Sequence, residues 1–148
     1  MIFISHRGNL SGKNPEMENT PEYISKALEL GYDVEIDVWY HDDAFYLGHD
    51  EPDTECPLWL LNNEKIWVHA KNLPAIQKCI EASTPNFFWH QNDDYTLTNP
   101  GLIWTYPGKD LTNKSIAVLP EASEYSLELL SSAYGICSDE IEKYRMSL

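Results

Sequence analysis

Residues 33–50 decide the fold; they read Asp-Val-Glu-Ile-Asp-Val-Trp-Tyr-His-Asp-Asp-Ala-Phe-Tyr-Leu-Gly-His-Asp. The apolar residues of 34–38 and 44–48 predict two buried strands, because such short β-branched and aromatic runs are typical of strands. A third run at 2–5 comes directly before His6 and Arg7. Polar side chains therefore follow or interleave these strands, and α/β folds keep their chemistry at strand ends.

The remaining chain alternates short apolar runs with helical or loop segments, which favours parallel β/α architecture. Helices are expected at 21–31, 74–82 and 122–133, the first capped by Thr20. Eight strands are expected, the number in a closed barrel, at 2–5, 34–38, 44–48, 66–70, 86–89, 102–105, 115–119 and 135–138.

Chain length limits how complete such a barrel can be. The 148 residues supply about 18 per β/α unit, against roughly 30 in an ordinary barrel. The segment 135–139, Gly-Ile-Cys-Ser-Asp, reads as a closing strand and argues for a full circuit. The predicted fold is therefore α/β, a compact TIM-type (β/α)8 barrel with several helices reduced to loops. A single domain over residues 1–148 is expected.

Composition excludes several function classes. The net charge of −14 disfavours nucleic-acid binding, which needs a basic stripe, and anionic membrane surfaces. No apolar run is long enough for a membrane span, so membrane insertion is not expected. The N-terminus lacks a basic region before its first strand, which predicts a cytoplasmic protein. Three cysteines without metal-type spacing predict reduced thiols.

The residues near the strand ends suggest phosphate chemistry. His6 and His49 follow different strands, and imidazoles suit proton transfer on either side of a substrate. Arg7 has a guanidinium that matches two phosphate oxygens, although a structural ion pair would also explain it. Glu35 and Asp37 share one face of a strand. That face is either the interior, where a cation would join the two carboxylates, or a solvated exterior; spacing alone leaves both open.

Four short motifs carry a family resemblance. His-Arg-Gly at 6–8, Glu-Asn-Thr at 18–20, Glu-Ile-Asp-Val at 35–38 and His-Asp at 49–50 occur in this order. The chain resembles the glycerophosphodiester phosphodiesterases, within the phospholipase-C-like phosphodiesterases that share a TIM-type barrel. The resemblance implies a small-molecule phosphodiester substrate.

The resemblance also implies roles for these residues. It makes His6 and His49 the general acid and base, without saying which is which, and Glu35 and Asp37 the ligands of one divalent cation. It places Glu18 near the site, where it would orient the catalytic groups or the phosphate. Mg²⁺ or Ca²⁺ is the expected ion, because the ligands are oxygens.

One position departs from the family pattern. The pattern at the fourth strand is an acid, one residue and a lysine that reaches the phosphate; Lys71 matches, but His69 replaces the acid. A Glu35, Asp37 and His69 set would also admit Mn²⁺ or Zn²⁺. Three interpretations remain: a retuned metal site, a third catalytic histidine, or a weakened site.

Two functions from different classes follow. The first is metal-dependent hydrolysis of a small phosphodiester by two histidines. The alternative is a catalytically weakened phosphate- or metal-binding module of the same fold. Because residues 50–65 predict only a short loop, the pocket is expected to be open. Weaker candidates for lining it are His90, Glu121, Trp104, Tyr106 and Lys109.

Overall fold

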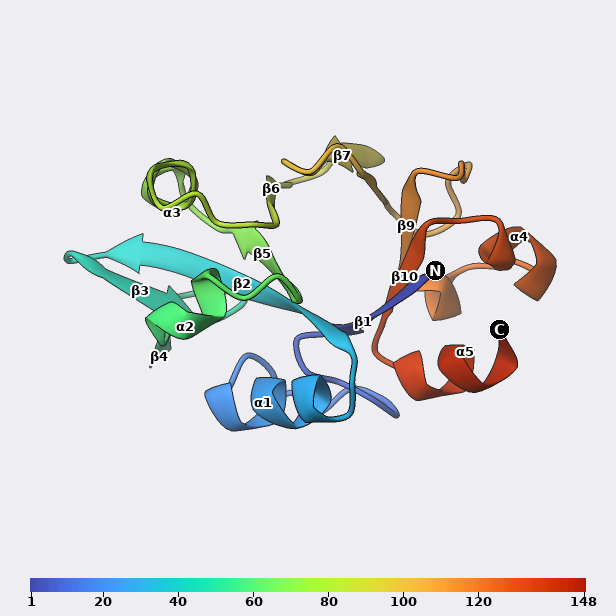
Figure 1. Ribbon diagram of the computed structural model, residues 1–148, viewed down its shortest axis with the longest axis horizontal. Helices are drawn as coiled ribbons and strands as arrows, with labels where there is room; N and C mark the ends of the chain where they lie inside the picture. The colour runs from blue at the N-terminus through green and yellow to red at the C-terminus, as the bar shows by residue number, and fades with distance from the viewer.

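The computed structural model describes residues 1–148 and consists of one mixed sheet of ten strands that curls into a half-barrel, with short helices outside it (Figure 1). The strands are β1 (Ile2–His6), β2 (Asp33–His41), β3 (Ala44–Leu47), β4 (Thr54–Glu55), β5 (Ile66–Ala70), β6 (Phe87–Trp89), β7 (Tyr95–Leu97), β8 (Ile103–Thr105), β9 (Ser115–Val118) and β10 (Gly135–Ser138). The helices are α1 (Pro21–Glu29), α2 (Leu58–Leu61), α3 (Leu73–Glu81), α4 (Leu127–Ser131) and α5 (Ile141–Ser147), with a 3₁₀ turn at Pro120–Ala122.

Seven strands run parallel in the order β6-β5-β2-β1-β10-β9-β8. The strand β7 adds to β8 in the antiparallel direction, and β3 adds to β2 in the same way. The length of β2 allows this branching, because Val34–Val38 pair with β5 and Val38–His41 pair with β3. The carboxyl ends of β1, β2 and β5 therefore lie next to one another.

The predicted (β/α)8 barrel is wrong. The third strand is not a parallel barrel strand, because Asp42 and Asp43 both have positive φ, 47° and 60°, and form a two-residue turn. Such turns close antiparallel hairpins, so β3 folds back on β2. The connections from β6 to β9 contain no helix, since residues 90–114 are rich in Asn, Asp, Gly and Pro. Without alternating helices, the sheet stays a curled half-barrel.

The individual elements agree better with the sequence than their arrangement does. All eight predicted strands are present. Their ends agree with the prediction within one residue, except that β2 continues to His41, three residues past the predicted end; β4 and β7 are additional. Two predicted helices correspond to α1 and α3, whereas the predicted helix 122–133 shrinks to α4. Residues 50–65 contain β4 and α2 where a loop was expected, and α5 was not predicted.

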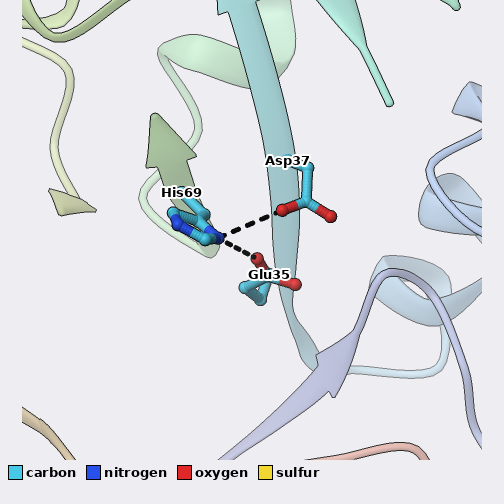
Figure 2. Close-up of side chains that lie close together, drawn as sticks. All are labelled: Glu35, Asp37 and His69. Carbon is cyan, nitrogen blue, oxygen red and sulfur yellow. Dashed lines mark ion pairs between the residues drawn. The ribbon is translucent and has the colours of Figure 1, made fainter. Parts of the chain in front are cut away.

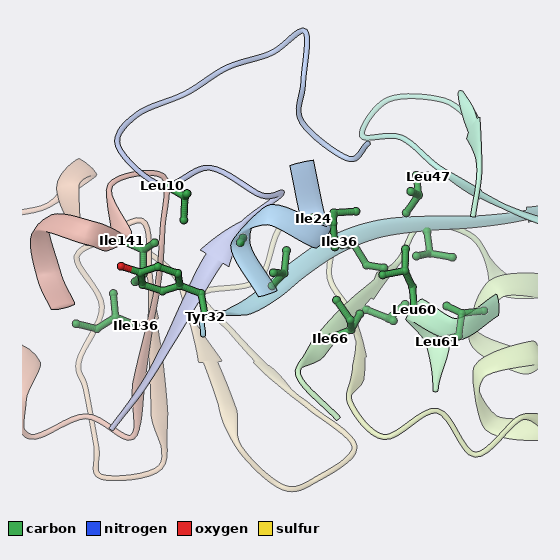
Figure 3. Close-up of a cluster of buried hydrophobic side chains, with 14 of the residues drawn as sticks. Leu10, Ile24, Tyr32, Ile36, Leu47, Leu60, Leu61, Ile66, Ile136 and Ile141 are labelled. Atoms are coloured by element: carbon green, nitrogen blue, oxygen red, sulfur yellow. The ribbon is translucent and has the colours of Figure 1, made fainter. Parts of the chain in front are cut away.

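Two clusters of buried apolar side chains pack against the two faces of the sheet. The larger one packs α1, α2 and α5 against one face of the sheet around Ile36, and Figure 3 shows its members lying between these elements. The smaller one surrounds Trp104 on the other face and includes Phe88 and Ile116. Burial of such side chains stabilises each by about 1.5–3 kcal/mol. No helix has the length and apolar character needed to cross a bilayer.

Candidate active site

The strand β2 presents two carboxylates to the concave side of the sheet. Along this strand Val34, Ile36 and Val38 belong to the larger apolar cluster, so the alternating Glu35 and Asp37 point to the opposite face. Their exposed fractions are 2% and 0%. Glu35 and Asp37 therefore point to the interior of the curled sheet, and the solvated exterior, the other orientation that the spacing allowed, is excluded.

Parallel pairing brings two histidines into register with these acids. His6 of β1 pairs with Glu35, and His69 of β5 pairs with Asp37. The Nδ1 atom of His69 lies 3.1 Å from Asp37 Oδ1 and 3.9 Å from Glu35 Oε1 (Figure 2). One ligand atom from each of Glu35, Asp37 and His69 lies within 4.8 Å of the other two.

Hydrogen bonding identifies the free nitrogen of His69. Its Nε2 lies 3.1 Å from the carbonyl oxygen of His90, and a carbonyl only accepts, so Nε2 carries the proton. In the neutral ring Nδ1 then carries a lone pair, and this nitrogen faces Glu35 and Asp37. A carbonyl partner on the outer nitrogen is the usual support for a metal-binding histidine.

The donor set fits a divalent cation. Glu35 Oε2 and Asp37 Oδ1 are buried without a hydrogen bond, although Asp37 Oδ1 is ion-paired with His69 Nδ1 and Lys71 Nζ. A cation shared by both carboxylates would offset the cost of burying them. Opposite ligands of one ion lie up to about 5 Å apart for Ca²⁺ and up to about 4 Å for Mg²⁺. The donor atoms of these three residues, all within 4.8 Å of one another, therefore fit Ca²⁺ as they lie and would have to draw closer around Mg²⁺. Without a cation, a proton on Nδ1 has to bridge the same oxygens.

The two carboxylates have opposite pKa shifts. Burial and the charge of Asp37 raise the pKa of Glu35. Burial acts the same way on Asp37, but the imidazole of His69 and the charges of Arg7 and Lys71 outweigh it and hold the Asp37 pKa well below its usual range. Arg7 Nε lies 2.9 Å and Lys71 Nζ 3.4 Å from Asp37. A cation next to Glu35 would favour its ionised form.

His6 has a buried carboxylate partner that sequence reasoning missed. Its Nδ1 lies 2.7 Å from Oδ1 of Asp139, which follows β10, and Asn9 Nδ2 donates to the same oxygen at 2.8 Å. Burial lowers the His6 pKa, but the hydrogen bond to Asp139 and the charge of Glu35 outweigh it, and the pKa is raised. The available signal was an acid directly after a buried strand, the same signal that identified His6.

Arg7 is held by carboxylates on two sides. Besides Asp37, its Nη1 lies 3.2 Å from Glu18 Oε2, and Glu18 Oε1 accepts from Asn9. Glu18 does not line the main pocket; it lies in a smaller neighbouring one of about 370 Å³. Asn19, also missed, brackets Asp37 by donating to Oδ2 and accepting from the Asp37 amide, both at 3.0 Å. The Glu-Asn-Thr motif thus orients Arg7 and Asp37.

His49 reaches the site from the antiparallel hairpin. It follows Gly48, where φ is 152° and a Cβ would overlap the Glu51 carbonyl, so the turn requires glycine. Trp39 Nε1 donates to the Gly48 carbonyl at 2.7 Å and ties this turn to β2. The His49 side chain is 46% exposed and its Nδ1 lies 2.7 Å from Asp50 Oδ1.

One pocket of about 600 Å³ joins most of these residues. It is lined by His6, Arg7, Lys13, Glu35, His49, His69, Lys71, Trp89, His90, Gln91, Trp104, Tyr106, Val118 and Leu119. Of the weaker candidates, His90, Trp104 and Tyr106 line it. Glu121 does not, because it accepts from Ser138 Oγ and the Asp139 amide, and Lys109 pairs with Asp94. Lys13, Trp89 and Gln91 were not identified from the sequence.

Comparison with known proteins adds no identification: no family model, no curated protein and no solved structure matches this chain.

Proposed function

We propose that this protein hydrolyses a small phosphodiester with the help of one divalent cation held by Glu35, Asp37 and His69. The observation that supports this proposal most is the set of charged side chains that line the pocket. Its lining includes three cationic side chains, Arg7, Lys13 and Lys71, and a single carboxylate, Glu35, in a chain of net charge −14. Asp37 and Asp139 pair with these cations from outside the lining, so the cationic groups are the ones that face a ligand. They favour a small anion, whereas the acidic protein repels a polyanion.

The side chains divide the work of binding. Lys71 and Arg7 would neutralise phosphate oxygens, Lys71 from a side chain that is 16% exposed at the pocket. Glu18 would act through Arg7, since its carboxylate touches the guanidinium. A cation bound at Glu35, Asp37 and His69 would supply a Lewis acid for a phosphoryl oxygen.

The two histidines would move the protons. Asp139 has a lowered pKa, because the hydrogen bond and charge of His6 outweigh burial, so it accepts and His6 Nδ1 donates. The neutral His6 ring then has its lone pair on Nε2, which takes a proton from the attacking water as the water oxygen bonds to phosphorus. His49 gives a proton to the leaving oxygen as the phosphorus–oxygen bond breaks. Asp139 is a positioning residue for His6.

One observation favours the alternative of a binding module without turnover. The Arg7 guanidinium is engaged by Asp37 and Glu18, so in this arrangement part of its charge is already neutralised. A phosphate would then be held chiefly by Lys71 and the cation.

The test is hydrolysis of bis(p-nitrophenyl) phosphate by metal-stripped protein resupplied separately with Mg²⁺, Ca²⁺, Mn²⁺ or Zn²⁺. We expect metal-dependent turnover that His49→Ala lowers by about 10²-fold or more. His41→Ala is the matched control, because His41 is an exposed histidine on the same hairpin and pairs only with Asp42. Metal binding without turnover would favour the binding module instead.

A further inference from the structure

The pocket has two chemically different walls. The ends of β1, β2 and β5 contribute its charged groups, as described above. The other wall comes from the ends of β6, β8 and β9. Besides His90 and Gln91 it consists of apolar and aromatic residues: Trp89, Trp104, Tyr106, Val118 and Leu119. The proposed reaction uses none of these five residues.

Stacking holds two members of the aromatic wall, Tyr106 and Trp104, in place. Tyr106 stacks on His90 with ring centroids 3.6 Å apart and planes inclined by 18°, and the Tyr106 carbonyl accepts from Tyr125. Trp104, 2% exposed, stacks on Phe88 at 4.4 Å. Trp89 by contrast is 36% exposed. A preorganised aromatic surface loses little entropy when a second flat group packs on it.

The pocket is larger than a phosphate and a metal ion require. Its volume of about 600 Å³ corresponds to roughly 20 water-sized volumes, and a phosphate group fills only a few of them. The remaining space adjoins the apolar wall. A substrate that leaves this space to water would gain nothing from the buried aromatic surface.

Charge decides which kind of group fits that space. A cationic arm would meet Arg7, Lys13 and Lys71 against one lining carboxylate. An anionic arm would be drawn to the same cations as the phosphate and would leave the apolar wall to water. An uncharged planar arm is neither repelled by these cations nor drawn away from the apolar wall, and it gains from stacking and burial.

We infer that the pocket takes a phosphodiester in which one ester arm is a flat, uncharged aromatic group packed against Trp89 and Tyr106. This inference rests on the proposed function, because it assumes that the phosphate lies at the charged wall. It narrows the substrate class to phosphodiesters with an aromatic arm and excludes those with two small aliphatic arms as preferred ligands.

The experiment compares the binding of diphenyl phosphate and diethyl phosphate by isothermal titration calorimetry, with Mg²⁺ present. Both diesters carry one negative charge, so the comparison isolates the arm. We expect diphenyl phosphate to bind about tenfold more tightly. Trp89→Ala and Tyr106→Leu should each remove at least two thirds of that preference. Trp59→Ala is the matched control, since Trp59 is 47% exposed on α2 and does not line the pocket.

The outcomes separate this inference from the proposed function. Equal binding of the two diesters would overturn the aromatic arm while leaving the phosphate site intact. A preference that Trp59→Ala also removes would overturn it too, because the binding would then be unspecific. If neither diester binds, the inference fails together with the proposed function.

Discussion

Two regions of this molecule build one pocket in different ways. The first, residues 1–71, supplies charged and titratable side chains at the ends of β1, β2 and β5, most of them fixed by hydrogen bonds or ion pairs to other polar residues. The second, residues 86–119, supplies the aromatic wall, which is fixed by ring stacking. The difference teaches that the positions of side chains in the first region depend on the balance of their charges, whereas those in the second region depend on how the rings pack.

The largest expected effect comes from Asp37 in the first region. Asp37→Ala removes a proposed ligand and leaves Arg7 and Lys71 without their buried partner. We expect the unfolding free energy to fall by about 3–5 kcal/mol and Mn²⁺ affinity by at least about 100-fold. Urea unfolding measures the free energy of unfolding, and isothermal titration calorimetry measures the Mn²⁺ affinity. Asp42→Asn, at an 83% exposed side chain in the nearby turn, should change neither.

A smaller effect is expected when the His6 partner is removed. Asp139→Asn takes away the interaction that raises the His6 pKa, so that pKa falls. The limb of the pH–rate profile that reports His6 should move to lower pH, and turnover should drop by about 10²-fold. Stopped-time assays across the pH range check this. An unshifted profile would contradict the assigned positioning role of Asp139.

The second region should respond through stability and leave metal binding alone. Trp104→Leu removes a fully packed ring that stacks on Phe88 and faces Trp67. We expect a loss of about 2–3 kcal/mol in unfolding free energy. Mn²⁺ affinity measured well below the unfolding transition should stay within about twofold of the parent protein. A large loss of metal affinity would mean that the two regions are coupled.

The last comparison needs no change in stability and distinguishes how the two apolar clusters open. Cys56 and Cys79 lie in the larger apolar cluster and Cys137 in the smaller one. Burial raises the pKa of Cys56 to about 12 and of Cys79 to about 11, and it also raises that of Cys137. The folded protein should react with Ellman's reagent at least about 100-fold more slowly than the urea-unfolded chain. Single-cysteine variants would show which cluster admits the reagent first, and fast reaction of all three thiols would contradict their burial.

Local patterns in the sequence determined the strands and most of the charged candidates. Eight strands were predictable because each is a short segment of apolar residues, either continuous, as at 2–4, or alternating with polar ones, as at 34–38. The two-residue period of a strand showed that Glu35 and Asp37 share one face, which left the interior or the solvated exterior of the sheet as the two choices. His69 was singled out because its type departs from a motif, which requires no knowledge of distant contacts.

Tertiary structure decided the rest, because it depends on contacts between residues far apart in the chain. The two positive φ values at Asp42 and Asp43 turn β3 back on β2, and strand patterns do not distinguish that from a parallel strand. Asp139 reaches His6 across 133 residues through the pairing of β10 with β1. The aromatic wall gathers from β6, β8 and β9 in the same way. Local sequence thus determines which residues can do chemistry, and parallel pairing of distant strands decides which of them meet.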